Sequence, residues 1–212
     1  MGTEHLICVA SGGEYRIAQY GKFDGYPEVQ GMMVLSFLKS PDVSKLKQNL
    51  NNCSWITDDE YSKLWQDLGV NKNEKYVEFE VFNSFYSMHP ELDDRSGAKI
   101  LNIVADSTGE IKLQNDLDFS LNSEICKWAY VIDFDKNTFE VYIGDNLDPL
   151  DKTERFYDEE VNNNPFGDEI YPVKLHASFE LTDLPSEKEF LEICGSTEED
   201  IEHSFEYFGF DL

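Results

Sequence analysis

Alternating apolar and polar positions first pick out a set of short strands. Residues 6–10 and 15–20 are β-rich runs on either side of Gly12-Gly13, which predicts an amino-terminal hairpin. The clearest pair is residues 128–134 and 139–143, where aromatic and β-branched side chains flank a polar four-residue turn. A further strand is expected over residues 171–181.

Helical patterns occupy the segments between and after these strands. Thr57 and Glu60 have the spacing of a capping box at a helix start, and so do Ser186 and Glu189. Residues 75–86 fit either a helix or a strand. Helices are expected over residues 32–38, 42–50, 57–68 and 98–105, after Pro185 and from Ser196 onward, and an acidic surface loop over residues 145–164.

These elements predict a single α+β domain over residues 1–212. We expect a mainly antiparallel sheet with helices packed on one side, and the pattern leaves the strand order open. A chain of 212 residues is long enough to bury a sizeable core. With 41% hydrophobic and 14% aromatic residues, it is too rich in core formers to be a disordered acidic polymer.

The apolar stretches and the cysteines of the sequence indicate the cellular compartment of the protein. No stretch approaches the roughly 20 apolar residues that a membrane span needs, and no basic segment precedes an apolar run at the amino terminus. The four cysteines are far apart and form no CxxC pair, which favours buried free thiols in a reducing compartment. We therefore expect a cytosolic or nuclear protein that does not enter a membrane.

The charge is strongly negative and unevenly distributed. The chain holds 43 acidic and 17 basic residues, a net charge of −26, and residues 106–212 carry −21 of it. Such a field repels phosphate backbones and attracts basic proteins, so direct nucleic-acid binding is not expected. The leading hypothesis is a non-enzymatic protein that binds a basic protein surface, with charge mimicry of nucleic acid as a special case. Its expected acidic partner surface comprises Glu198, Glu199, Asp200, Glu202 and Glu206.

The segment over residues 21–31 is the most distinctive loop in the chain. It contains three glycines and a Tyr-Pro pair, too punctuated for strand or helix. It presents Asp24, Gly25, Tyr26 and Gln30 as candidate ligand or partner contacts. Two interpretations stay open: a site for a small molecule in an enzyme or receptor, and a purely structural turn in which Asp24 caps local amides and Tyr26 packs inward.

Other candidate chemistry is weaker. Asp133, Asp135 and Asn137 have the opening spacing of a calcium loop, but Thr138 stands where that loop needs glycine and Gly144 where it needs glutamate. We therefore expect an ordinary hairpin turn, no metal and no cofactor. Removal of the first two residues would expose Thr3 as an amino-terminal nucleophile, which makes such a hydrolase one form of the enzyme alternative.

The amino-terminal residues resemble a known pattern. Met1-Gly2-Thr3, His5-Leu6-Ile7, Ala18-Gln19-Tyr20-Gly21, Asp24-Gly25-Tyr26-Pro27 and Gln30-Gly31 are similar to a family of hypothetical proteins that is frequent in filamentous fungi and has shorter relatives in phages. The family motif reads roughly MGTRHLI…AQYGQWDGYPEGQG. This chain departs from it at Glu4, Lys22-Phe23 and Val29. The resemblance extends over most of the chain and implies one continuous domain, without implying a mechanism.

Overall fold

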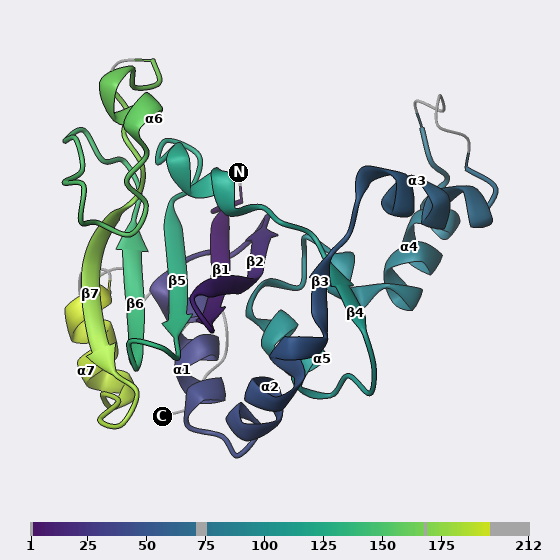
Figure 1. Cartoon of the computed structure of the whole chain (residues 1–212), viewed down its shortest axis with the longest axis horizontal. Coiled ribbons are helices and arrows are strands. Elements are labelled where there is room, and N and C mark those ends of the chain that lie inside the picture. The colour runs from purple at the N-terminus through teal and green to yellow at the C-terminus, as the bar shows by residue number, and fades with distance from the viewer. Residues whose placement is uncertain (1, 71–75, 168, 196–212) are drawn as a thin grey trace.

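A five-stranded sheet in the order β2-β1-β5-β6-β7 forms the centre of the computed structural model (Figure 1). The structure describes residues 2–70, 76–167 and 169–195. The strands are β1 (His5–Ser11), β2 (Glu14–Gly21), β5 (Trp128–Asp133), β6 (Thr138–Ile143) and β7 (Lys174–Glu180). The predicted α+β class, with a mostly antiparallel sheet and helices alongside, is confirmed.

Two hairpins joined through one parallel pair form four strands of the sheet, and β7 adds the fifth beside β6. β1 pairs antiparallel with β2, β5 with β6, and β6 with β7, whereas β1 and β5 run parallel with His5 opposite Trp128. A parallel neighbour requires a long crossover connection. The segment between β2 and β5 supplies it, and it contains most of the helices.

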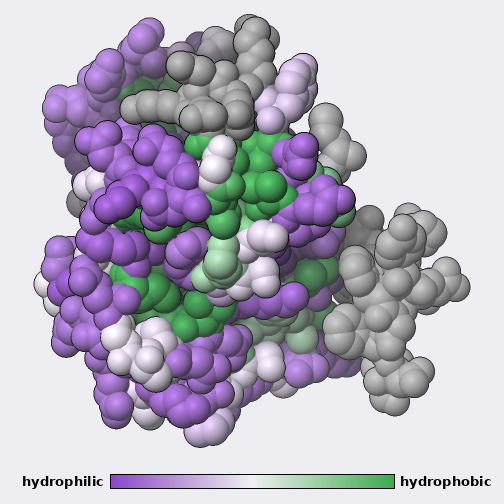
Figure 2. Space-filling model, turned by 90° about the vertical axis from the view of Figure 1, so that its right-hand side faces the viewer, coloured by the Kyte–Doolittle hydropathy of each residue, from purple (hydrophilic) through white to green (hydrophobic). Residues whose placement is uncertain are grey.

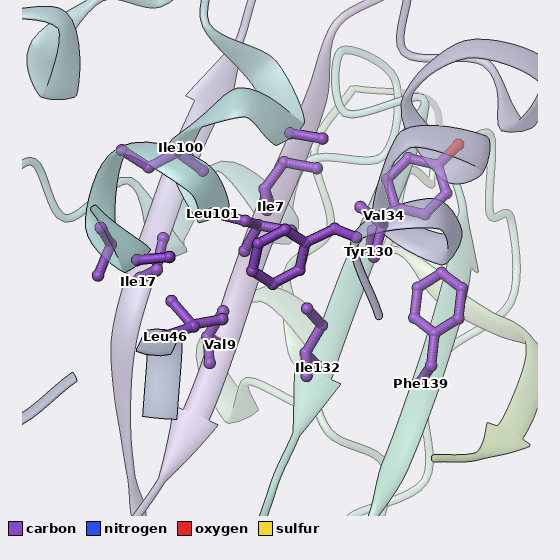
Figure 3. Close-up of a cluster of buried hydrophobic side chains, with 14 of the residues drawn as sticks. Ile7, Val9, Ile17, Val34, Leu46, Ile100, Leu101, Tyr130, Ile132 and Phe139 are labelled. Carbon is purple, nitrogen blue, oxygen red and sulfur yellow. The ribbon is translucent and has the colours of Figure 1, made fainter. Parts of the chain in front are cut away.

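One face of the sheet packs against helices and forms the larger core. Figure 3 shows Ile7, Val9 and Ile132 of the sheet beside Leu46 and Leu101. These side chains are fully buried, and burying a side chain of this kind contributes about 1.5–3 kcal/mol. The helices whose side chains enter this core are α1 (Met32–Leu38), α2 (Val43–Asn49), α5 (Ile100–Ala105) and α7 (Glu187–Cys194).

The other face is covered mainly by irregular chain. Leu150 and Phe156 pack there against Tyr142 and its neighbours in a second buried cluster. The expectation of a plain surface loop over residues 145–164 is therefore wrong in two respects. The segment buries apolar side chains, and it contains the short helix α6 (Glu159–Asn163), which begins where the Asp158 carboxylate accepts a hydrogen bond from the Val161 amide.

Two helices form a lobe that projects from the sheet (Figure 1). α3 (Asp58–Asp67) begins at the predicted Thr57–Glu60 capping box, and α4 (Phe79–Met88) shows that the ambiguous segment 75–86 is helical from Phe79. The sequence pattern did not predict the small parallel sheet beside this lobe, formed by β3 (Cys53–Trp55) and β4 (Ile111–Leu113).

Short helical turns complete the described elements. The expectation that residues 21–31 contain no helix is wrong from Pro27 onward, because the amides of Val29 and Gln30 both bond to the Tyr26 carbonyl. Proline favours such a start, since its fixed φ suits the first helical position. The turns are η1 (Pro27–Gly31), η2 (Leu50–Asn52), η3 (Pro90–Leu92), η4 (Gly97–Lys99) and η5 (Leu117–Leu121).

The capping box at Ser186 and Glu189 is confirmed at the start of α7. The helix expected from Ser196 lies outside the described residues. Among the residues that are described, no helix has the length and apolar character needed to cross a membrane.

Candidate binding surfaces

The 21–31 loop does not bring its four candidate residues together. Gly25 is buried, where its amide donates to the Thr3 carbonyl at 2.9 Å and its carbonyl accepts from the Tyr130 hydroxyl at 2.8 Å. Gln30 is also buried, and its Oε1 accepts a hydrogen bond from the Ala98 amide at 2.8 Å. Asp24, at a φ of 56°, and Tyr26 are exposed. Two of the four residues therefore anchor the loop and two face solvent.

The His5 ring lies beneath this loop, between two glycines. A methyl group on Gly21 would overlap Cε1 and Nε2 of the ring, and one on Gly25 would come within 2.8 Å of the His5 Cβ. Burial lowers the pKa of His5 to about 4, against a smaller opposing effect of the Thr3 backbone. The imidazole is therefore neutral at pH 7. The ring leaves no room for a side chain at position 21, and the His5 Cβ together with the Thr3 carbonyl leaves none at position 25.

Gln19 is a buried amide beside this site. It lies opposite Ile7 in the β1–β2 pair, and neither its Oε1 nor its Nε2 has a hydrogen-bond partner among the described residues. A buried amide without partners costs free energy, because it has lost its hydrogen bonds to water.

Replacing Gln19 with methionine should therefore stabilise the protein by about 1–2 kcal/mol. Methionine keeps an unbranched side chain while removing both unsatisfied groups. Urea unfolding at pH 7 measures the change, and Gln30→Met is the matched control, because it removes the hydrogen bond to Ala98 and should destabilise. If both variants lose stability equally, the Gln19 amide does have a partner.

Residues 122–126 and 144–171, apart from residue 168, form a layer that we call the acidic cap. Backbone and side-chain hydrogen bonds join its segments: the Asp145 and Asn146 amides donate to the Ser123 carbonyl and Oγ, and the Tyr171 amide donates to the Asn146 carbonyl. The cap has two basic residues, Lys152 and Arg155. Its nine described acids are Glu124, Asp145, Asp148, Asp151, Glu154, Asp158, Glu159, Glu160 and Glu169.

Arg155 connects the cap to the sheet through a buried ionic network. Its guanidinium donates to Asp133 of β5 and Glu140 of β6, and Glu140 also accepts from the Tyr142 hydroxyl at 2.7 Å. The Arg155 side chain is only 9% exposed. Burial alone would raise the pKa of both carboxyls, but Arg155 and other hydrogen-bond donors outweigh it and hold both below their usual range. Arg155, one of the two basic residues of the cap, is thus buried in the protein interior.

Apolar side chains are exposed among the acids of the cap. Leu147 is 62% exposed between Asp145 and Asp148, and Ile125 and Phe166 are also exposed. Asp145 pairs with Lys127 and Asp148 with Lys174, but these pairs are solvent-exposed and contribute little. The surface therefore combines weakly engaged carboxylates with apolar contact points.

The structure does not describe the acidic residues that the sequence predicts to form a partner surface. Glu198, Glu199, Asp200, Glu202 and Glu206 are all outside the described residues. Their role stays a prediction from the sequence.

The calcium-like sequence serves as a turn. The Asp135 carboxylate accepts from the Gly12 and Gly13 amides at 2.9 Å each, and Asp133 Oδ1 accepts from the Asp135 and Lys136 amides. The two bonds to Asp135 fasten the β5–β6 turn to the β1–β2 turn, and the two bonds to Asp133 are local to the β5–β6 turn. Within the described ranges, no group of three or more His, Cys, Asp or Glu side chains is arranged to hold a metal.

The cysteines are poor nucleophiles. All four are free, and burial raises the pKa of Cys53 to about 11 and of Cys194 to about 12, while those of Cys8 and Cys126 also rise. A thiol is reactive only as its thiolate, so such shifts suppress its chemistry at neutral pH.

The chain matches no protein-family model, no curated protein and no solved structure. The resemblance of its amino-terminal motif to a fungal and phage family stays an expectation. Several motif positions have structural roles, since His5 packs between Gly21 and Gly25, and a methyl group on Gly31 would approach Phe190 to 2.8 Å.

Proposed function

We propose that this protein is a non-enzymatic binding protein that engages a basic protein surface through the acidic cap. The observation that carries the proposal is Leu147, exposed between Asp145 and Asp148 on a layer with nine carboxylates. Carboxylates steer a basic partner toward the surface, and apolar side chains buried in the contact supply affinity. The acids at 198–206 extend the same charge in the sequence.

The geometry of the cap favours binding because the layer is pre-organised. Asn146 is buried, and its side-chain amide donates to the Asp148 and Pro172 carbonyls at 2.8 and 2.9 Å. These bonds fix the turn that presents Leu147. A surface already held in shape loses little conformational entropy when it binds.

The charge also defines the kind of partner. A net charge of −26 opposes contact with phosphate backbones, so nucleic acid itself is a poor ligand. A basic protein surface that normally holds nucleic acid is a suitable one, and there the cap would act as a charge mimic.

Affinity capture with a cap variant tests the proposal. The variant combines Asp145→Asn, Asp148→Asn, Glu159→Gln and Glu160→Gln, and asparagine tolerates the positive φ of 52° at position 145. We expect basic proteins captured by the wild-type chain at low salt to be released at high salt, because screening weakens exposed ion pairs. The cap variant should retain at least about tenfold less of them.

The matched control carries Glu14→Gln, Asp183→Asn, Glu187→Gln and Glu192→Gln, four exposed acids outside both the cap and the lobe of α3 and α4. This control should bind as the wild type does, both in capture and in calorimetry with the purified partner. Equal loss in the two variants would mean that net charge alone attracts the partner. Equal retention would mean that the cap is not the contact. Either result rejects the proposal.

A second candidate function is binding of a small molecule at the 21–31 loop, in an enzyme or a receptor. In its favour, Asp24 and Tyr26 remain exposed on a loop fixed at both ends, and Asp24 keeps a positive φ of 56°. A thermal-shift screen against nucleotides, sugars and amino-acid derivatives tests it. A compound that stabilises the wild type should not stabilise Asp24→Asn, a substitution that preserves the backbone conformation. If no compound of the set stabilises the wild type, this second candidate function is contradicted.

A further inference from the structure

α3 packs on α4 through Tyr61 and Trp65, whereas its Leu64 side lines a groove. None of its residues is buried, although Tyr61, Leu64 and Trp65 lie along the helix. The lobe of α3 and α4 projects at the end of the molecule away from α6 (Figure 1). Figure 2 views the molecule from that end and shows apolar patches among hydrophilic side chains. A helix face of this kind indicates a docking surface.

A groove of about 650 Å³ runs along this helix. Its apolar lining includes Ile56, Leu92 and Ile111, and residues 107–110 and the start of β4 also line it. The residues of α3 that line it have the spacing i, i+3, i+4 and i+7 of one helix face: Glu60, Lys63, Leu64 and Asp67. The groove is thus apolar inside and charged along its rim.

The charges around the groove are mainly negative. Lys112 is already paired with Glu60 at 3.2 Å and Glu110 at 3.4 Å, which leaves Lys63 as the other lysine of the lining. Over residues 57–70 and 76–88 the lobe contains six acids and one lysine. A second copy of the chain would bring like charges together, so a basic segment is the complementary occupant.

The lobe is held in place without any contribution from the cap. The Trp65 indole stacks on Phe85 with centroids 3.8 Å apart. Arg95 lies 5.2 Å from the ring centroids of both Phe82 and Tyr86 and forms a two-pronged ion pair with Asp93. These contacts fix α3 and α4 to the segment after η3, so the groove is preformed.

We propose that this groove binds a basic amphipathic segment of a partner protein. Apolar side chains of the segment contact Leu64 and Ile56, and its lysine or arginine side chains face Asp67 and Glu91. The inference takes only the basic character of the partner from the proposed function of the cap, and it adds a second, separate contact surface.

The probe is a synthetic amphipathic peptide of about four helical turns, with leucine on one face and lysine on the other. Calorimetry compares its affinity for the wild type with that for Asp67→Lys and for Leu64→Ser. We expect each substitution to weaken binding at least about tenfold, because one repels the lysines and the other removes an apolar contact. The matched controls are Glu192→Lys, with the same charge change on α7, and Leu175→Ser, an exposed leucine on β7; both should change affinity less than about twofold.

Isoleucine methyl resonances locate the peptide. Binding in the groove should shift Ile56 and Ile111, which line it, whereas Ile125 reports the cap. Shifts at Ile125 alone would contradict binding in the groove and support binding at the cap. Equal weakening of peptide binding by Asp67→Lys and Glu192→Lys would mean that net charge alone attracts the peptide, which also contradicts the proposal. The four-residue cap variant should bind the peptide in the groove as before. Failure at one surface is thereby distinguished from failure at the other.

Discussion

Replacing Arg155 with methionine should destabilise the protein by about 3–5 kcal/mol, because it leaves two buried carboxylates without a cation. Asp133 and Glu140 are both nearly inaccessible to solvent and both accept hydrogen bonds from the guanidinium. Methionine fills similar space but supplies no charge and no donor. Urea unfolding at pH 7 measures the loss. The wild type and the variant are compared with one common slope for the dependence of the unfolding free energy on urea concentration.

Two further variants separate the buried network from ordinary surface ion pairs. Lys174→Met removes an exposed partner of Asp148 and should cost less than about 1 kcal/mol. Adding Asp133→Asn and Glu140→Gln to Arg155→Met should recover much of the stability, since the buried charges are then gone. An Arg155 variant no less stable than the Lys174 variant would show that the network carries no such energy.

The network also couples the proposed binding surface to the core. Arg155 belongs to the cap, whereas Asp133 and Glu140 belong to adjacent strands of the sheet. Phe156, the next residue, is buried against Tyr142 with ring centroids 4.8 Å apart. The irregular chain of the cap is thus attached to the sheet by the ion pairs of Arg155 and by the packing of Phe156. These two attachments explain why the cap keeps one conformation although it has little regular secondary structure.

Local features of the fold were predictable because their causes are local. The capping boxes at Thr57 and Ser186 need only a fixed spacing within one turn, and both form. The β5–β6 hairpin likewise follows from its turn and the flanking apolar residues. The parallel pairing of β1 with β5 was not predictable, since the side-chain pattern of a strand does not encode the direction of its neighbour.

The candidate sites were harder to predict because their contacts are long-range. Gln30 resembled a ligand-binding residue in a glycine-rich loop, yet its acceptor bonds an amide 68 residues away. Arg155 stood in an acidic segment, and nothing nearby in the sequence indicated that it would be buried. Position in the sequence identified the charged half of the chain, but only the fold shows which of its acids are hydrogen-bonded inside the protein and which are exposed to solvent.

Acidification should destabilise the protein through His5, by about 3 kcal/mol between pH 6.5 and pH 4. The pKa of this imidazole falls from 6.5 in the unfolded chain to about 4 in the folded one, chiefly through burial. Between those values the unfolded state binds a proton that the folded state excludes, so stability is greatest above pH 6.5 and declines as pH falls. Below about pH 4 both states are protonated and the loss is complete.

Carboxylates such as Asp133 and Glu140 also lose stabilisation in acid, so the His5 contribution must be measured as a difference between variants. In His5→Gln the buried imidazole is absent, and the free energy of unfolding should fall about 3 kcal/mol less than in wild type from pH 7 to pH 4. His176→Gln is the matched control, because it makes the same substitution at an exposed position on β7. Identical pH profiles of unfolding free energy for His5→Gln and wild type would contradict this prediction. They would mean that the ring accepts a proton while it stays between Gly21 and Gly25, and that the loop above it moves to let water reach the ring.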